Sequence, residues 1–222
     1  MEKPNTTFDL QKYLQNGKLT KPFLPTEYVM QKVMCDYNAK VADGRPASKL
    51  SSLFCWIDKY VEFERQDKDF VANNKFMRNA EQIWQSKKTT GCTDYAILFA
   101  CFARQIGIPT TFLHTAEQNY INRLKNGEIT NRHVGHSFCE CFYDGEWVLV
   151  DPTYKKIEYY YNAEKIVLSY NVGENNVFVP YMRDLDLGKK QSIRQHNDIM
   201  DKMVSDQMLH IDKMWPLLYL FL

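Results

Sequence analysis

The dipeptide Asp144-Gly145, set between two apolar segments, constrains the fold more than any other short feature of this 222-residue chain. Asp-Gly is a preferred sequence for the two-residue type I′ turn that joins adjacent antiparallel strands. The segment 133–153, HVGHSFCECFYDGEWVLVDPT, is therefore predicted to form a β-hairpin. With a two-residue loop, Tyr143 pairs with Glu146, and the remaining pairs follow from that register.

This register assigns each side chain to a face, because side chains alternate along a strand. His136 and Asp151 share one face as diagonal neighbours, about 7–8 Å apart at the backbone. Pro152 has no N–H to donate, so the strand ladder should open there and leave the pair at the mouth of the hairpin. Such a pair is either a satisfied structural contact or a base held by its aspartate. The His136 face also carries Phe138, Glu140, Phe142, Trp147 and Leu149, and the opposite face carries Ser137, Cys139, Cys141, Val148 and Val150.

A buried helix is predicted directly after the tripeptide TTG, starting at Cys92. Its sequence, CTDYAILFACFARQIG, is ended by Gly107 with Pro109 beyond it. A helix N-terminus carries roughly half a positive charge, which lowers the pKa of a cysteine placed there. An adjacent imidazolium would lower the pKa of Cys92 further, whereas Asp94 acts in the opposite direction. Buried cysteines such as Cys101 usually behave as small apolar residues.

The remaining patterns place helices first and an antiparallel sheet later, which is the order of an α+β domain. We expect one domain over residues 1–222, with its motif-bearing core at about 70–160 and helical extensions on both sides. The tyrosine run 159–161 is predicted to form one strand with rings on both faces, or alternatively the wall of a groove. The expected helices cover 24–42, 48–66, 79–86 and 189–209, and the expected strands outside the hairpin cover 109–115, 157–162 and 165–172.

Charge and cysteine content exclude several classes of protein. The 28 basic and 27 acidic residues give a net charge of +1, which argues against a nucleic-acid partner or an anionic membrane held by bulk charge. The start, MEKPNTTFDLQKY, lacks the apolar core of a secretory signal peptide. Six cysteines are too sparse for a disulfide scaffold in a chain of this length, so we expect reduced thiols in a cytoplasmic protein.

The last segment, MWPLLYLFL from Met214, is strongly apolar. It is too short to span a membrane, which takes about 20 apolar residues. Two interpretations are open: the segment packs on the core, or it contacts a partner or a membrane surface.

A zinc site is one alternative use of the hairpin. His133, Cys139 and Cys141 would share a face of one regular strand, but His136 would point away from them, so the four could not close a tetrahedron and no metal is expected. Glu140 is expected to be a structural acid that meets an arginine such as Arg104, or else a hydrogen-bonding partner near His136. The histidines 114, 196 and 210 have no companions in the sequence and are expected to lie in solvent or in the core.

Together, GCTDYAILFACFARQIGIP and GHSFCECFYDGEWVLVDPT resemble the transglutaminase-like superfamily, over about residues 79–153. The resemblance implies a papain-like α+β fold, with the cysteine-bearing helix packed on an antiparallel sheet. It also implies a catalytic triad of Cys92, His136 and Asp151 that needs no cofactor. The matching positions are Cys92, Asp94, Tyr95, Ala96, Arg104, Gly107, Ile108, Pro109, His136, Phe138, Glu140, Trp147, Asp151, Pro152 and Thr153.

The implied reaction is acyl transfer from an amide or peptide bond through a thioester, on a peptide or protein substrate. Hydrolysis of a peptide, isopeptide or side-chain amide is expected. Transfer of a glutamine acyl group to an amine and a non-catalytic binding module are the alternatives. The Cys92 backbone N–H is expected to stabilise the oxyanion, with Gln85 or Trp84 as the second donor. Thr90, Thr110 and Thr111 depart from the pattern of the family and are expected to reshape the groove.

Overall fold

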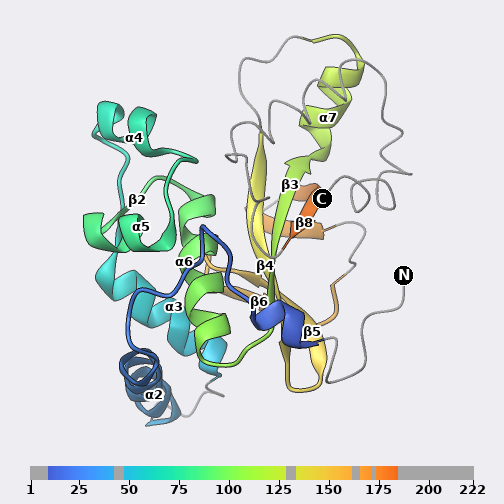
Figure 1. Ribbon diagram of the computed structural model, residues 1–222. Helices are drawn as coiled ribbons and strands as arrows, with labels where there is room; N and C mark the ends of the chain where they lie inside the picture. Colours follow the sequence, from blue (N-terminus) through green and yellow to red (C-terminus); the bar gives the residue numbers. More distant parts are fainter. Residues whose placement is uncertain (1–9, 43–47, 129–133, 162–165, 172–173, 185–222) are drawn as a thin grey trace.

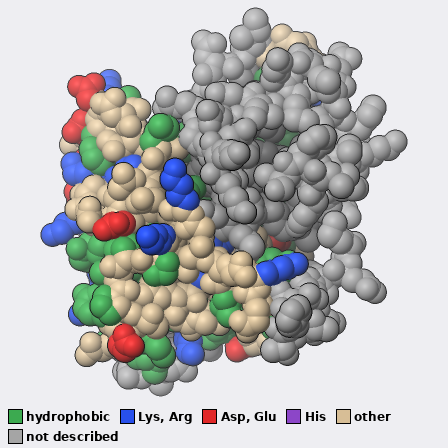
Figure 2. Space-filling view, in the orientation of Figure 1, with side chains coloured by type: hydrophobic (Ala, Val, Ile, Leu, Met, Phe, Trp, Pro, Cys, Tyr) green, Lys and Arg blue, Asp and Glu red, His purple; other side chains and the backbone are tan. Residues whose placement is uncertain are grey.

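A computed structural model describes residues 10–42, 48–128, 134–161, 166–171 and 174–184 (Figure 1). The helix predicted at 189–209 and the apolar segment from Met214 lie outside the described residues. Within the part described, no helix has the length and apolar character needed to cross a membrane. On the face shown in Figure 2, lysine and arginine side chains are interspersed with aspartate and glutamate, as the near-zero net charge suggests.

Most of the helices form one layer of the molecule and a sheet forms the other, with α6 between the other helices of its layer and the sheet (Figure 1). The mixed helix and sheet architecture confirms the predicted α+β class. The helices of the first layer are α2 (Thr26–Ala42), α3 (Lys49–Tyr60), α4 (Lys68–Asn74), α5 (Ala80–Ser86) and α6 (Cys92–Gln105). The short helix η1 (Lys12–Leu14) lies beside the sheet, where Tyr13 packs edge-on against Trp147 (Figure 1).

The sheet has six strands in the order β6-β5-β4-β3-β8-β7, and all neighbouring pairs are antiparallel. Helix α7 (Gln118–Lys125) extends from the end of β3. The six strands are β3 (Thr110–Glu117), β4 (Gly135–Tyr143), β5 (Glu146–Asp151), β6 (Lys156–Glu158), β7 (Ile166–Asn171) and β8 (Glu174–Asp184).

The main core lies between α6 and one face of the sheet. Every residue of α6 from Thr93 to Arg104 is buried, so this helix has no solvent-facing stripe. The sheet contributes Phe112, Cys139, Cys141, Val148 and Val150 to this core. A smaller cluster on the other face of the sheet contains Leu113, Phe138, Leu149 and Phe178.

The predicted hairpin register is confirmed. Tyr143 pairs with Glu146 and Phe142 with Trp147, and the ladder between β4 and β5 continues to Cys139 and Val150. Asp144 and Gly145 have φ of 51° and 87°, the two positive values that a type I′ turn requires.

The predicted end of α6 is confirmed as well. Gly107 has a φ of 83° and donates its N–H to Arg104, while Ile108 donates to the Ala103 carbonyl. These two bonds form a Schellman motif, which glycine favours because a Cβ opposes a positive φ.

Three local predictions are wrong. Helix α3 ends at Tyr60 rather than near 66, because Val61 is extended and the next residues form β1 (Glu62–Phe63), which pairs in parallel with β2 (Lys88–Thr89). Helix α4 forms in the polar stretch between the expected helices 48–66 and 79–86, where no helix was expected, and the Asp67 carboxylate accepts the N–H of Phe70 as an N-cap. The tyrosines 159–161 lie beyond the end of β6 rather than in a strand.

Candidate active site

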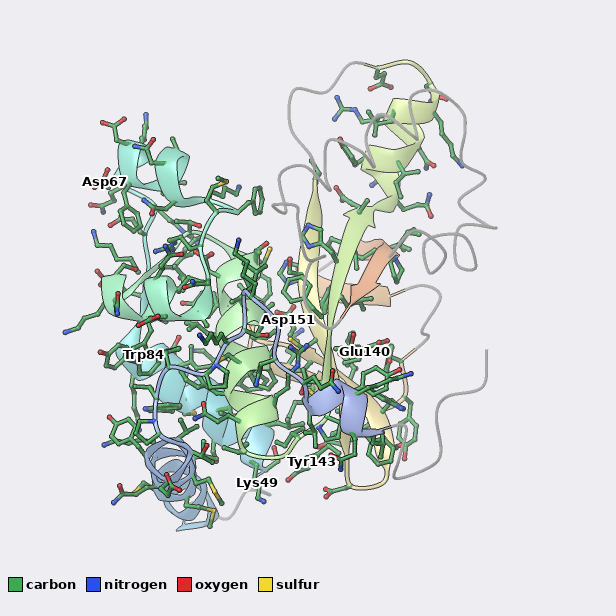
Figure 3. The ribbon with its side chains drawn as sticks, viewed as in Figure 1. Lys49, Asp67, Trp84, Glu140, Tyr143 and Asp151 are labelled. Carbon is green, nitrogen blue, oxygen red and sulfur yellow. The ribbon has the colours of Figure 1, made fainter. Side chains whose placement is uncertain are left out.

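The three residues of the predicted triad come from three elements. Cys92 is the first residue of α6, His136 is the second residue of β4, and Asp151 is the last residue of β5. In the view of Figure 3, Asp151 lies close to α6 at the open end of the hairpin, and His136 makes a hydrogen bond with Cys92. The first turn of α6 and the open end of the hairpin are therefore neighbours.

The carboxylate of Asp151 is held at both oxygens. His136 Nε2 lies 2.9 Å from Oδ2, and Oδ1 accepts the backbone N–H groups of Thr153 at 3.0 Å and Tyr154 at 3.2 Å. Asp151 is only 2% exposed. A fixed, buried carboxylate orients the imidazole and leaves its other nitrogen, Nδ1, for Cys92.

Cys92 and His136 are hydrogen-bonded and shift each other's ionisation. Burial raises the pKa of the Cys92 thiol, but the charge and hydrogen bond of His136, with the hydroxyl and N–H of Ser137, outweigh it and lower this pKa. Burial likewise lowers the pKa of His136, and the Cys92 thiolate and Asp151 outweigh it and raise this pKa. Both shifts favour a thiolate–imidazolium pair over the neutral pair.

The segment that leads into Cys92 is clamped by a buried ion pair. Oδ2 of Asp94 accepts the backbone N–H of Thr90 at 2.7 Å and its hydroxyl at 2.8 Å, and it is paired with Arg78. Arg78 also donates to the Lys88 carbonyl at 2.9 Å and to Ser86 Oγ at 2.7 Å. The negative charge of Asp94, expected to oppose a thiolate at Cys92, is therefore offset by a guanidinium.

The two predicted side-chain donors of the oxyanion hole are engaged elsewhere. Gln85 donates its amide to Glu81 at 3.1 Å on the exposed face of α5. Trp84 stacks on Tyr60 with ring centroids 3.6 Å apart and packs edge-on against Phe102. Phe102 lies about 15 Å along α6 from Cys92, at 1.5 Å of rise per residue. In Figure 3, Trp84 lies on the far side of α6 from Asp151.

Glu140 and Arg104 also have partners other than those expected. Glu140 accepts the hydroxyl of Tyr161, whereas Arg104 donates to the Thr110 carbonyl and to Thr20 Oγ1, both at 2.9 Å. The reason is the alternation of the strand: Cys139 and Cys141 face α6, so Glu140 between them faces away from the helix that carries Arg104.

Two residues near Cys92 are absent from the sequence-based prediction. Ser137 contacts the thiol through both its N–H and its hydroxyl, and its buried side chain lies 2.7 Å from His114 Nδ1. The register had placed Ser137 on the face opposite His136, together with Cys139 and Cys141, and the structure packs this face on α6. That shared face was the available signal. Arg78 gave no signal, because its ion pair with Asp94 depends on how α5 and α6 meet. Among the residues described, no group of three or more histidine, cysteine or acidic side chains is placed to hold a metal ion.

Comparisons with known proteins agree with this fold. The family model of the transglutaminase-like superfamily matches residues 36–152. A solved structure from Cytophaga hutchinsonii, of a protein proposed to be a cysteine protease, superimposes with a TM-score of 0.50 at 15% sequence identity. The alignment covers 83% of this chain and 50% of that chain, so this chain spans about half of its length. No curated protein matches the sequence significantly. The family match extends over more than half of the sequence, and the protein belongs to the transglutaminase-like superfamily.

Proposed function

We propose that this protein hydrolyses an amide bond, in a peptide, an isopeptide or a side-chain amide, through a thioester on Cys92. The observation that carries the proposal is the hydrogen-bonded line from the Cys92 sulfur through the His136 ring to the Asp151 carboxylate. A thiol next to an imidazole that a third group orients is the arrangement of an activated nucleophile. A binding module on the same fold would gain nothing from a thiol whose pKa is lowered in this way.

In the acylation step, the Cys92 thiolate attacks the carbonyl carbon of the substrate and an S–C bond forms. The N–H of Cys92 has no partner within α6, because the first four N–H groups of a helix lack one, so it is placed to donate to the oxyanion. Loss of one such donor typically costs about 3 kcal/mol of transition-state stabilisation. The His136 imidazolium then gives its proton to the leaving nitrogen, the C–N bond breaks and the amine departs.

In the deacylation step, neutral His136 takes a proton from water, and the hydroxide formed attacks the thioester. The C–S bond breaks, the acid product leaves, and the thiolate–imidazolium pair is restored. Asp151 remains ionised throughout and holds the ring. A primary amine in place of water would give transfer with the same intermediate, so the acceptor alone separates the two reactions.

The test is the fate of the acyl group. The protein would be incubated with a panel of peptides, isopeptides and glutamine side-chain amides in ¹⁸O-labelled water, with and without a primary amine. We expect a mass adduct on Cys92, an acid product that carries one ¹⁸O atom, and little change on addition of amine. A saturable amine dependence with the amine incorporated would overturn hydrolysis in favour of transfer.

Two variants make the result specific. Cys92→Ala should abolish the adduct and the product, whereas Cys101→Ala, in the same helix, should retain both. Cys101 is a suitable control because it is fully buried and its thiol lies 3.8 Å from the main-chain carbonyl oxygen of Lys21. If no substrate of the panel forms an adduct while the thiol remains reactive toward iodoacetamide, the acyl-transfer proposal fails and the binding module is favoured.

A further inference from the structure

A buried polar cluster lies beside Cys92 on the side of the sheet that faces α6. It consists of Thr93 from α6, His114 from β3 and Ser137 from β4, which are 2%, 3% and 0% exposed. Ser137 Oγ lies 2.7 Å from His114 Nδ1 and 3.0 Å from Thr93 Oγ1. His114 and Ser137 are directly opposite each other in the ladder of β3 and β4, so the pairing of the strands fixes this contact.

The number of protons available sets the direction of these hydrogen bonds. A serine hydroxyl donates one hydrogen and accepts up to two. Ser137 has three polar neighbours at this hydroxyl, namely Cys92, Thr93 and His114. A thiolate can only accept, so the Ser137 hydrogen is directed at Cys92 when the thiol is ionised. Thr93 and His114 must then both donate to the Ser137 oxygen, which requires a hydrogen on His114 Nδ1.

We propose that His114 is a positioning residue that acts on Cys92 through Ser137. The Ser137 hydroxyl donates to the thiolate, and His114, with Thr93, holds that hydroxyl in the donating orientation. Hydrogen bonds to a charged acceptor are stronger than neutral ones, and donors in series polarise one another in a dry site. The inference deepens the proposed function and rests on it, since it concerns the same nucleophile.

The charged groups around the thiol lie outside this cluster. His136 and Asp151 approach from β4 and β5, and Asp94 with its partner Arg78 lies at the start of α6 and before α5. Substitutions at His114 and Ser137 leave these four groups in place. A change in the ionisation of Cys92 in such variants therefore reports the cluster itself.

The experiment is the pH dependence of Cys92 alkylation by iodoacetamide, followed by peptide mass spectrometry. Ser137→Ala should raise the midpoint by about one to two pH units, because one hydrogen bond to the charged sulfur is lost. His114→Leu should raise the midpoint by a smaller amount. His114→Asn should bring it back toward the wild-type value, because the asparagine amide can supply an N–H near the former Nδ1.

The matched control is Thr110→Val, which removes another buried hydroxyl from β3. Thr110 Oγ1 contacts the Ile108 carbonyl and Cys141 rather than the cluster, so the Cys92 midpoint should stay at the wild-type value. Protection of Cys139 and Cys141 from alkylation would verify that each variant is folded. If His114→Leu does not fold, the inference is still tested by Ser137→Ala and His114→Asn. Ser137→Ala should raise the alkylation midpoint of Cys92, and His114→Asn should leave it near the wild-type value.

The double variant Ser137→Ala/His114→Leu separates a relay from a direct effect. If His114 acts through Ser137, the double variant should have the midpoint of Ser137→Ala alone. An additional shift, or a Ser137→Ala midpoint equal to that of the wild type, would overturn the inference. These measurements use no substrate. If the alkylation midpoints shift as expected but no substrate forms an acyl adduct on Cys92, the proposed function is refuted and the role of His114 is not. If adducts form but the midpoints do not shift, the role of His114 is refuted and the proposed function is not.

Discussion

The six cysteines show how the surroundings of one residue type decide its chemistry. Burial raises the pKa of Cys139 well above its ordinary value and raises that of Cys141 to about 12. Burial also raises the pKa of Cys92, but the His136 imidazolium and the two hydrogen-bond donors of Ser137 outweigh it and lower this pKa. A thiol with a hydrogen-bonded cation becomes a nucleophile, and a thiol among apolar neighbours remains a small core residue.

At the residue scale we predict how the triad sets the ionisation of Cys92. Its thiolate form is lost as the pH falls through the lowered pKa, so alkylation should already be fast near neutral pH. His136→Ala removes the cation and should move the alkylation midpoint upward. Asp151→Asn should also move the midpoint upward, but by less, because the His136 ring remains and is only less basic and less well oriented. Iodoacetamide labelling from pH 5 to 10 measures all three midpoints.

The internal controls for this labelling are Cys139 and Cys141, which should react slowly in every variant. Two results would mean that the contact between His136 and Asp151 is structural. One is a wild-type Cys92 that reacts no faster than these two cysteines, and the other is an alkylation midpoint that His136→Ala leaves unchanged.

At the scale of elements, the start of α6 depends on a contact remote in sequence. Asp94 lies in the first turn of the helix, and its partner Arg78 precedes α5. Through this pair and the bonds of Thr90, the turn that precedes Cys92 is tied to both helices. Both side chains are almost completely buried, at 5% and 1% exposure, so neither charge has water as a substitute partner.

Arg78→Met should therefore lower the free energy of unfolding by about 3–5 kcal/mol, since it leaves a buried carboxylate unpaired. Arg78→Met/Asp94→Leu should be less destabilised than Arg78→Met alone, because no unpaired charge remains. Urea unfolding followed by circular dichroism measures both. Lys155→Met is the comparison: it breaks the pair with Asp58, whose side chains are 45% and 44% exposed, and should cost less than about 1 kcal/mol. Equal costs for Arg78→Met and Lys155→Met would contradict the assigned role.

At the scale of the whole molecule, the candidate site exists only where two layers meet. The helical layer supplies Cys92, and the sheet supplies His136, Asp151 and Ser137. The fully buried Phe99 of α6 belongs to the same core cluster as Phe112, Val148 and Val150 of the sheet, and its ring centroid lies 5.2 Å from that of Phe54 in α3. The packing that stabilises the domain therefore also holds Cys92 next to His136.

We predict that fast alkylation of Cys92 and the folded circular dichroism signal disappear at the same urea concentration. The thiol loses its imidazolium partner when the layers separate, and small domains usually unfold in one cooperative step. Phe99→Ala should shift both transitions together to lower urea, by about 3–5 kcal/mol in the free energy of unfolding. Fast labelling that persists after the circular dichroism signal is lost would show that the ionisation of Cys92 is a local property of the helix.

Much of the candidate site could be predicted because it depends on local rules. Asp144-Gly145 fixes a turn, the turn fixes a register, and the register places His136 and Asp151 on one face. The two-residue strands β1 and β2 could not be predicted, because each is stabilised by the other from a distant part of the sequence. The N-cap at Asp67 was missed because its segment lacks the apolar periodicity that marks longer helices.

The sequence by itself determined the hairpin, the start and end of α6, and the family, since turn preference, glycine conformation and apolar periodicity act over a few residues. Only the tertiary structure decided which groups touch the sulfur of Cys92. Ser137, His114 and Arg78 reach the site through strand pairing and helix packing, so no short segment contains both members of any of these contacts. The same holds for Gln85 and Trp84: proximity in sequence to Cys92 did not decide where α5 directs its side chains, which contact Glu81 and Tyr60.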